Sequence, residues 1–582
     1  MTVNKSRILL VTALKDKNKK YLKKPLLAIS TGCIKYLDHD FYKSDLKILD
    51  NDLKKESLLK YFRYTNIIYK YYLNKISIKL NEIHKVQYSK DYWKVIIGPW
   101  LIRFISIIYD RVRSIELAKK NKILYVKINN YTKKDYEFND IIDFHNNITS
   151  DNWNNIIYHQ IIKTLKYCPI KKFRCIKEKK KIENKKNIKQ KLIFIISKLA
   201  NLFYFCIRKN DIFFIKTYFG TKISFFLQLC LLQFPYITNE EIRLRFDRRK
   251  RVISFNKKNN NKIIYLLDRL IPKHIPKIYL EGYKNTLKFI DRLPWPKQPK
   301  FIYSSNSFLN DDIFNIYLAE QKRRYKTKFI SGQHGGVYFS SKYFFIQKMQ
   351  FDISDFFLTW GRKYKRSNKY IPMFNFLNNK KVNFRKNGRL LFIDYEFSRF
   401  PCSIGLTIFM QNKHLQSLED RFNFFKKINS KILNFTTIKM TAQDFGWKTK
   451  ERYESKGIIC NFAKRDDNLF KLLAQSRICL SNINSTVYLQ TLNINFPTII
   501  FLNKNIELMN KEFLLALNNL RDAGVVFYTP EEAANQVNLV WDSVDVWWNS
   551  KKVQNSVSVF CNKYSKRSEQ KLADLYNFFK AQ

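Results

Sequence analysis

Glycine, proline and paired cysteines are scarce in this sequence. It has 13 glycines and 13 prolines in 582 residues, too few for a collagen-like or low-complexity chain. Its nine cysteines stand singly, without a CxxC pair or a Cys/His cluster of zinc-binding spacing. The N-terminal apolar run is too short for a signal peptide. We therefore expect a reduced, cytoplasmic protein with no metal site.

Long uninterrupted apolar runs are missing as well. A membrane-spanning helix needs roughly 18 or more apolar residues in succession. The three most apolar stretches, Val95–Tyr109, Leu192–Ile207 and Ile212–Tyr236, are each interrupted by lysine or arginine. We predict a buried helix for each of them instead of a membrane span.

Acidic residues are few: 48 Asp and Glu stand against 107 Lys and Arg, which gives a formal net charge of +59. Such a charge attracts polyanions and makes a nucleic-acid-binding protein one alternative function. However, the residues in excess (Lys, Asn, Ile, Phe and Tyr) all have A/T-rich codons, so a genome biased toward A and T would produce this charge without selection for a polyanionic partner. The lysines are also diffuse, and no helix-turn-helix, RNP or zinc signature is found. We expect no nucleic-acid partner.

Short apolar strands alternate with helical stretches along much of the chain, a pattern typical of α/β folds with parallel sheets. Lys43–Ile115 is a long stretch with helical periodicity, in which Gly98-Pro99 predicts a break. Strands are predicted in Arg7–Leu14, Pro25–Thr31, Phe301–Ser307, Lys328–Gly336, Asp355–Gly361, Tyr370–Phe376, Arg389–Phe400, Lys431–Met440, Arg477–Asn482 and Pro497–Asn503.

Two such α/β blocks are separated by a polar stretch, Asn378–Asn387. We predict two Rossmann-like domains that face a cleft. The N-terminal domain would span 1–380 and contain a largely helical insertion at about 40–290, and the C-terminal donor-binding domain would span 388–528. Residues 529–582, which open with the helix-start signal Thr-Pro-Glu, are expected to form closing helices that pack back across the domains.

The first motif, "SGQHGG", gathers three of the 13 glycines around His334, just past a predicted strand. Ligands of α/β folds bind at the carboxyl ends of strands. Gly332, Gly335 and Gly336 would allow positive φ and a close approach of backbone N–H groups to a ligand, so Gly335→Val is expected to abolish activity. His334 could be a general base, a cation beside a phosphate, or an ordinary turn histidine, and this stretch leaves all three open.

The second motif follows a predicted strand and begins a predicted helix through Tyr488–Leu492. Asn484, Ser485 and Thr486 have the side chains of a helix N-cap. A helix N-terminus that carries hydroxyl groups is a ready site for an anion. Ordinary capping without a ligand is the alternative.

These pieces together resemble the transferases found in bacterial O-antigen and other surface-polysaccharide clusters. The matching stretches are "RILLVTAL", "KPLLAIST", "DYWKVIIGPWLIRFISIIYDRVRSI", "PKFIYSSNSF", "SGQHGG", "FFLTWG", "DFGW", "NSTVYLQTLNINFPTIIF" and "DVWWNS". They extend over nearly the whole chain, although the region 120–290 matches weakly. The broader likeness is to enzymes with the two-domain glycosyltransferase B fold.

The resemblance implies transfer of a sugar from a nucleotide-activated donor to a surface glycan of the O-antigen, lipopolysaccharide or capsule type, without a further cofactor. A glycerophospho- or phosphosugar transferase of the same fold is the alternative. We expect His334 to be the base, with Asp394 and Glu396 as backup bases past a strand end. Candidate donor- and phosphate-binding residues are Gly332, Gln333, Gly335, Gly336, Arg399, Lys439, Asn484, Ser485, Thr486 and Gln490.

Two features of the sequence bear on the metal and on the activity of the proposed transferase. No DxD metal motif is evident, because the adjacent Asp311 and Asp312 precede a helix. The family carries a glutamate where this chain has Gln490, which can form hydrogen bonds but lacks the charge. A non-catalytic scaffold that keeps the fold is therefore a further alternative.

One segment suggests contact with a membrane surface. The lysine-rich run Lys171–Lys191 is followed at once by the apolar stretch Leu192–Ile207. A polybasic run beside an apolar helix binds anionic lipid surfaces. It would hold the enzyme at the inner face of the cytoplasmic membrane, near a lipid-linked acceptor. A lysine-rich loop beside a buried helix is the alternative.

Overall fold

A computed structural model describes residues 5–13, 24–34, 45–49, 55–173, 206–235, 244–246, 251–255, 259–364, 367–377, 380–402, 414–502 and 509–582. Its chain forms two compact units. Unit 1 contains residues 1–62, 335–345 and 359–568, and unit 2 contains 63–334, 346–358 and 569–582. Most of Lys171–Lys191 and of Leu192–Ile207, and part of the stretch 378–387, lie outside the described residues.

Unit 1 contains β1 (Arg7–Leu10), β2 (Leu26–Ala28), β3 (Leu46–Ile48), β10 (Tyr370–Pro372), β11 (Arg389–Asp394), β12 (Thr436–Met440), β13 (Asn461–Phe462), β14 (Ser476–Ser481), β15 (Thr498–Phe501) and β16 (Val526–Phe527). Its helices are α13 (His414–Lys427), α14 (Ser430–Asn434), α15 (Thr449–Ser455), α16 (Leu469–Leu473), α17 (Thr486–Asn493), α18 (Lys511–Asp522), α19 (Pro530–Val540), α20 (Val544–Trp548) and α21 (Lys551–Tyr564).

Helix α1 (Lys55–His84) leads from unit 1 into unit 2. The strands of unit 2 are β4 (Ile123–Asn129), β5 (Ile170–Phe173), β6 (Phe213–Ile215), β7 (Phe301–Ser304), β8 (Lys328–Gly332) and β9 (Phe356–Thr359). Its helices are α2 (Lys90–Ala118), α3 (Ile141–Asn147), α4 (Asp151–Leu165), α6 (Thr221–Cys230), α7 (Lys262–His274), α8 (Tyr283–Ile290), α9 (Ser307–Asn310), α10 (Asp312–Tyr325), α11 (Phe345–Ile353) and α22 (Lys571–Ala581).

The largest sheet of unit 1 is parallel and has the strand order β13-β12-β11-β14-β15-β16. Counted from β11, this order is 3-2-1-4-5-6, which defines the doubly wound nucleotide-binding fold. The chain reverses its direction of travel across the sheet between β11 and β14. In sheets of this kind the ligand binds at that switch point, beyond the carboxyl ends of the two strands.

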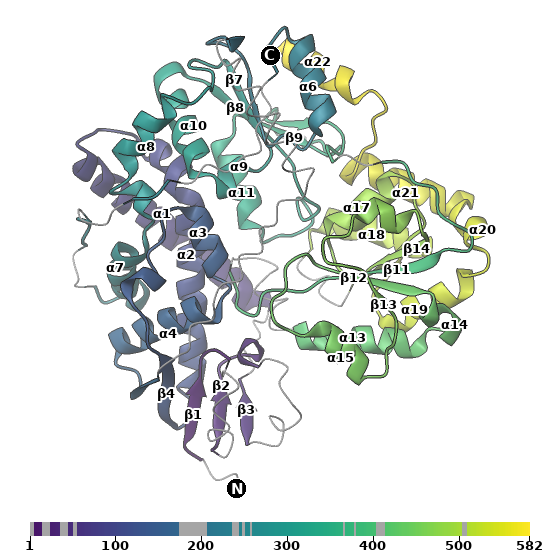
Figure 1. Cartoon of the computed structure of the whole chain (residues 1–582), viewed down its shortest axis with the longest axis horizontal. Helices are drawn as coiled ribbons and strands as arrows, with labels where there is room; N and C mark the ends of the chain where they lie inside the picture. The colour runs from purple at the N-terminus through teal and green to yellow at the C-terminus, as the bar shows by residue number, and fades with distance from the viewer. Residues whose placement is uncertain are drawn as a thin grey trace. The chain divides into compact units, whose positions relative to one another are not determined.

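Alternate residues of β11 are buried on opposite faces of this sheet. Leu390 and Phe392 join the core formed with α13 and α19, whereas Leu391 and Ile393 join a core on the side of α16 and α17. Figure 1 shows α13 and α19 on one side of the sheet and α17 and α18 on the other. Helices on both faces of a parallel sheet confirm the predicted α/β class. Unit 1 also contains the smaller parallel group β1-β2-β3.

Unit 2 contains a second parallel sheet, in which β6, β7, β8 and β9 lie side by side in chain order. A further parallel pair joins β4 to β5. The long helix α2 is buried over most of its length and packs against α10. No described helix is both long and apolar enough to cross a membrane.

The predicted helix break at Gly98-Pro99 is wrong. Both residues are buried inside α2, and the break occurs earlier, where Lys85 has a φ of 57° and Ser89 caps α2 by accepting the Tyr92 N–H at 3.1 Å. A proline inside a helix removes a hydrogen bond and costs about 3 kcal/mol. The nearly complete burial of α2 outweighs this cost.

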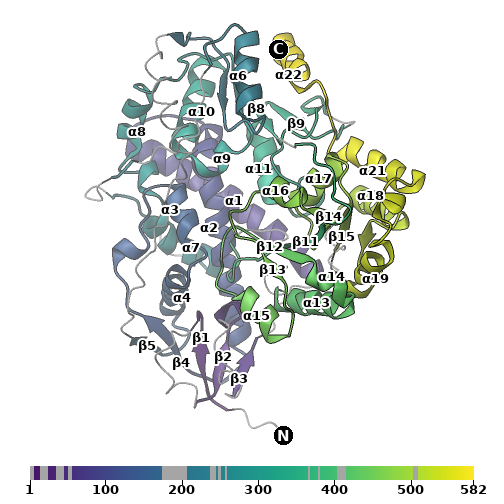
Figure 2. The ribbon, with the colours of Figure 1, turned by 45° about the vertical axis from the view of Figure 1, so that its right-hand side comes forward.

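The prediction of one buried helix over Ile212–Tyr236, which was based on its apolar character, is wrong. It contains strand β6, then a loop that ends at Gly220 with a φ of 83°, then α6. A three-residue strand and one turn of a helix have the same apolar pattern in sequence. The pairing of β6 with β7 therefore decides that a strand forms here. The C-terminal helix α22 packs beside α6, and both Figures 1 and 2 show the two helices together.

Candidate active site

The start of α17 lies beyond the carboxyl end of β14, one of the two strands at the switch point. Ser485 is the N-cap residue, and its hydroxyl accepts the Val487 N–H at 3.3 Å. The Thr486 hydroxyl accepts the Gly336 N–H at 3.1 Å, which leaves its own proton available for another acceptor. Both residues are half-buried. A half-buried helix N-terminus with hydroxyl donors suits an anionic group.

The second half of the "SGQHGG" motif packs directly on this helix start within unit 1. A Cβ added to Gly336 would lie 2.6 Å from the Ser485 carbonyl oxygen, so only glycine fits there. The Asn484 side-chain amide donates to the Ser340 hydroxyl at 2.9 Å, and the Tyr488 hydroxyl donates to Asn484 at 2.7 Å. Two motifs 150 residues apart therefore form one structure.

Gly332 and Gly336 serve close packing, and no glycine of the motif has a left-handed backbone. None of Gly332, Gly335 and Gly336 has φ in the left-handed range. A Cβ on Gly332 would lie 2.2 Å from the Tyr303 hydroxyl oxygen, whereas one on Gly335 would meet only Thr486 Oγ1, at 3.6 Å. The positive φ proposed for Gly335, one of the two reasons given for the Gly335→Val defect, is therefore not found. The other reason, a close approach of the backbone to a ligand, stays a prediction.

His334 is half-buried and follows the last paired residues of β8. The N–H of Gln333, itself buried, donates to the Leu358 carbonyl at 2.9 Å and continues the sheet up to the imidazole. Burial lowers the pKa of His334 to about 4, although hydrogen bonds to the backbone of Ser305 and Gly332 act in the opposite direction. The imidazole is therefore neutral near neutral pH, which suits a proton acceptor better than a cation beside a phosphate.

Asp394, the last residue of β11, has no exposed surface. Its carboxylate accepts hydrogen bonds from the Arg421 guanidinium, the Tyr453 hydroxyl at 2.9 Å and the Asn482 amide at 3.2 Å. Asn482 directly follows β14, so this bond joins the two strands at the switch point. Three donors and complete burial favour a role for Asp394 in holding the sheet edge together.

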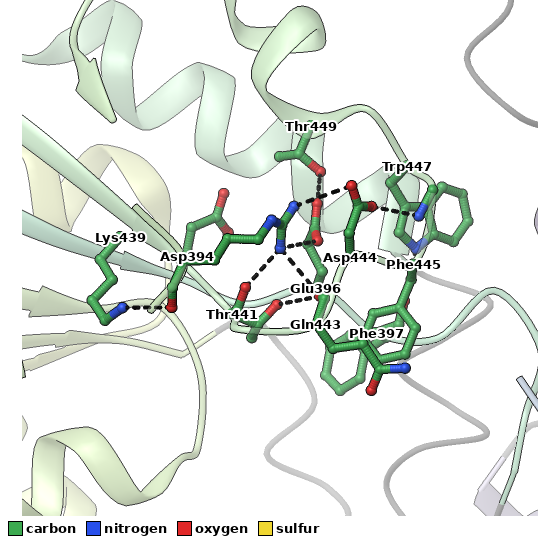
Figure 3. Close-up of polar contacts among 12 residues, drawn as sticks. Asp394, Glu396, Phe397, Lys439, Thr441, Gln443, Asp444, Phe445, Trp447 and Thr449 are labelled. Carbon is green, nitrogen blue, oxygen red and sulfur yellow. Dashed lines mark hydrogen bonds and ion pairs between the residues drawn. The ribbon is translucent and has the colours of Figure 1, made fainter. Parts of the chain in front are cut away.

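Glu396 is also fully buried, and its carboxylate accepts from the Thr449 hydroxyl and from the Arg465 guanidinium at 2.9 Å (Figure 3). Burial raises the pKa of Glu396, and these two donors oppose the shift. Arg465 also donates to the carbonyl oxygens of Thr441 at 2.6 Å and Gln443 at 3.1 Å. Glu396 and Arg465 together therefore fix the loop that follows β12.

Arg399 and Lys439, the two predicted cationic residues, differ in how deeply they are buried. Arg399 is buried and donates to the backbone carbonyls of Phe445 at 2.7 Å and Gly32 at 3.0 Å. Lys439 is half-buried and donates to the Arg465 carbonyl at 3.2 Å, and burial lowers the pKa of its ammonium group. Gln490 is half-buried on α17. Lys439 and Gln490 thus keep side-chain surface toward solvent.

Sequence analysis missed the residues that bind these carboxylates: Arg421, Tyr453, Thr449, Arg465 and Asn482. They come from different helices and loops, so no local spacing of residues predicts them. A partial signal was the "DFGW" stretch quoted above. The Trp447 indole of that stretch donates to the Phe397 carbonyl at 2.7 Å, and Figure 3 shows the ring beside the same loop.

The chain belongs to the LIC12162 family of transferases, because the family's sequence model matches residues 7–579. It is therefore a transferase. A search of curated proteins finds no significant match.

Several solved structures resemble the chain weakly. The spinosyn rhamnosyltransferase SpnG complexed with spinosyn aglycone shares 6% identity over 51% of this chain and 76% of its own, with a TM-score of 0.29. An α,α-trehalose-phosphate synthase (UDP-forming) from Burkholderia vietnamiensis shares 9% identity over 49% of this chain and 72% of its own, with a TM-score of 0.28. A UDP-GlcNAc 2-epimerase from Neisseria meningitidis bound to UDP-GlcNAc shares 10% identity over 75% of this chain and 97% of its own, with a TM-score of 0.32. Likenesses this low add nothing to what the strand order establishes.

Proposed function

We propose that this transferase is a glycosyltransferase that moves a sugar from a nucleotide-activated donor to a hydroxyl group of a surface glycan. The donor diphosphate binds at the start of α17, where Ser485, Thr486 and the backbone N–H groups face the switch point. Lys439 adds positive charge near the carboxyl end of β12, which is separated from β14 by β11. His334, neutral at physiological pH, accepts the proton of the attacking hydroxyl.

The observation that carries this proposal is the junction of the two motifs in unit 1. Gly336 donates its N–H to Thr486 Oγ1 at 3.1 Å, at the switch point of a sheet with the 3-2-1-4-5-6 strand order. The hydroxyl proton that this bond leaves available is a donor for a phosphate oxygen. Helix N-termini and hydroxyl groups stabilise the negative charge that develops on a departing diphosphate.

Binding of nucleotide sugars to the full chain tests the donor class. Thermal denaturation is measured with UDP-, GDP-, dTDP- and CMP-sugars and, for the glycerophosphate alternative, with CDP-glycerol. A ligand at 100 times its Kd stabilises the folded state by ~2.7 kcal/mol. We expect one nucleotide sugar to stabilise the protein more than CDP-glycerol does; the reverse result favours the glycerophosphotransferase.

A pair of matched variants locates the binding site. Ser485→Ala and Thr529→Ala each remove the hydroxyl of an N-cap residue, from α17 and α19 respectively. Each change costs about 1 kcal/mol of stability for the loss of the cap. Only Ser485→Ala should also weaken the stabilisation by the nucleotide sugar. An equal loss in both variants, or in neither, would contradict a donor site at α17.

We also propose that the acceptor is lipid-linked and that the enzyme contacts the inner face of the cytoplasmic membrane through the basic run that begins at Lys171. Liposome flotation tests this with the variant in which Lys179, Lys180, Lys181, Lys185 and Lys186 become Gln. Binding to anionic but not neutral vesicles, lost in the variant, would support the contact. Equal flotation of both proteins would remove this segment from the mechanism.

A further inference from the structure

Helix α6 of unit 2 carries its large apolar residues on the outside. Phe225, Phe226 and Leu229 are 39%, 51% and 43% exposed. Two of the three buried residues of the helix are polar, namely Ser224 and Gln228, and the Gln228 side-chain amide donates to the Ser224 carbonyl at 2.9 Å. A surface helix of a soluble protein usually turns its apolar stripe toward the core. The residue pattern of α6 is largely the reverse, and packing within the chain does not explain it.

Leu232, just past the end of α6, is 82% exposed and has a left-handed backbone with a φ of 56°. Its N–H donates to the Leu229 carbonyl at 2.8 Å, and the Gln233 N–H donates to the Gln228 carbonyl at 2.8 Å. This pair of bonds is the Schellman motif, which favours glycine at the position of Leu232. Left-handed φ is unfavourable for a residue with a Cβ, and an apolar side chain gains nothing from exposure to water. A leucine at this position therefore points to a role outside the fold.

Phe225, Phe226, Leu229 and Leu232 form one continuous surface, which we call the α6 patch. The two phenyl rings meet edge to face, with 5.6 Å between their centroids. Leu229 lies one turn further along the same side of the helix, and Leu232 is bonded to its backbone. Helix α22 packs beside α6 (Figure 2), yet these four side chains stay exposed. An exposed apolar patch of this kind marks a contact with a partner or a membrane.

Positive charge surrounds the α6 patch and selects between these occupants. Lys222 is exposed one turn before the two phenylalanines, and Lys209 is also exposed. The Arg208 guanidinium, 63% exposed, donates to the Leu232 carbonyl at 2.7 Å and so lies beside that leucine. Asp211 is the only acidic residue between 206 and 235, and it is buried and paired with Arg208 at 2.9 Å. This surface attracts an anionic partner, and it repels a second copy that would present the same cations.

We propose that the α6 patch inserts into the surface of an anionic lipid bilayer, with Arg208, Lys209 and Lys222 beside the lipid headgroups. Apolar side chains of a helix that lies on a membrane enter about 5–10 Å into the boundary between headgroups and acyl chains. Basic residues beside them interact with anionic headgroups. This inference deepens the proposed membrane contact and rests on it, but it does not depend on the lysine run that begins at Lys171.

Flotation of the full chain with phosphatidylcholine vesicles, with and without phosphatidylglycerol, tests the patch. Leu232→Gly is the decisive variant, because it removes the apolar side chain and also relieves the left-handed backbone. Its melting temperature should stay the same or rise, whereas its partition into anionic vesicles should fall roughly tenfold, as expected for one buried leucine side chain. Phe226→Ala should weaken the partition by a similar factor. Undiminished partition of both variants would overturn the proposal.

Leu539→Ala is the matched control. Leu539 is a comparably exposed leucine, at 75%, but it lies on α19 in unit 1. Its replacement removes exposed apolar surface without touching the α6 patch, so the partition should stay unchanged. If Leu539→Ala weakens the partition as much as Leu232→Gly does, the binding depends on apolar surface in general and the assignment to α6 is overturned.

The failures of the two proposals are distinguishable. If the wild-type chain floats with neither kind of vesicle, the membrane contact fails and the α6 patch fails with it, whereas binding of nucleotide sugars is measured separately. If replacing the five lysines with Gln abolishes flotation but Leu232→Gly and Phe226→Ala float normally, the lysine run stands and the α6 patch is overturned. If the chain dimerises without lipid and Phe226→Ala makes it monomeric, the patch is a self-association surface and the lipid assignment is overturned.

Discussion

The carboxyl edges of the two large sheets differ in how deeply their polar groups are buried. At the edge of the unit 1 sheet, Asp394 and Glu396 are fully buried and accept hydrogen bonds from three and two side chains respectively. At the edge of the unit 2 sheet, His334 and Tyr218 are half-buried, and the Asn306 amide donates to the Tyr218 hydroxyl at 2.9 Å. Both edges carry polar residues after apolar strands, so position alone does not separate them.

The difference suggests that complete burial beside a cationic partner distinguishes a structural polar group from a reactive one. A buried carboxylate surrounded by donors has a low reactivity toward a substrate, and its removal leaves the partner cation unpaired. A half-buried imidazole with a lowered pKa can accept a proton from a ligand that reaches it. The two edges should therefore respond to mutation in opposite ways, one in stability and the other in turnover.

The largest expected effect is on turnover, at the unit 2 edge. His334→Ala should lower kcat by ~10²–10⁴-fold, the usual contribution of a general base. Its free energy of unfolding should change little, because the ring is half-buried and its bonds are to backbone groups. Kinetics and urea unfolding of the same preparation measure both quantities. Near-normal turnover in the variant would reduce His334 to a residue of the turn.

The second effect is on stability, at the unit 1 edge. Asp394→Ala leaves the buried Arg421 guanidinium without its carboxylate, which costs about 3–5 kcal/mol in comparable buried pairs. Replacing both residues, with Arg421→Met added, should cost less than the single change because no unpaired charge remains. Urea unfolding measures all three proteins. A stable but inactive Asp394→Ala protein would instead identify Asp394 as a catalytic group.

A smaller effect separates two adjacent glycines of the motif. Gly336→Ala places a Cβ 2.6 Å from the Ser485 carbonyl oxygen, and overpacking of this kind costs about 1–3 kcal/mol. Gly335→Ala introduces only an ordinary contact, at 3.6 Å from Thr486 Oγ1, and should change stability by less than about 0.5 kcal/mol. Melting temperatures of the two variants decide the matter, and equal destabilisation would contradict the packing described at Gly336.

The smallest effect is a change in the pH dependence of stability. The pKa of His334 falls from 6.5 to about 4 on folding, so between these values the unfolded chain binds a proton that the folded chain does not. Stability therefore decreases as the pH falls through this window. His334→Gln should remove about one proton from this linkage and flatten the slope by about 1.4 kcal/mol per pH unit near pH 5. An unchanged slope would mean that His334 titrates normally in the folded protein.

Local sequence patterns were enough to predict the α/β class and most of the strands that form the two edges. The apolar runs at Phe301–Ser307, Lys328–Gly336 and Arg389–Phe400 contain β7, β8 and β11, and the helix predicted after Ser485 is α17. The helix start at Thr529-Pro530 is also confirmed, with Thr529 accepting the Glu532 N–H. These features depend on local burial periodicity, turn chemistry and capping, which a short window of sequence contains.

The donors that surround each buried carboxylate come from distant parts of the chain and could not be predicted from sequence. Asp394 meets Arg421 and Tyr453 from two different helices, and Gly336 meets Thr486 from 150 residues away. The strand β6 and the left-handed loop after it were not predicted, because their apolar residues favoured a helix and the pairing of β6 with β7 decided the conformation. Hydrogen-bond saturation and close packing arise between residues distant in the chain, so no local pattern encodes them.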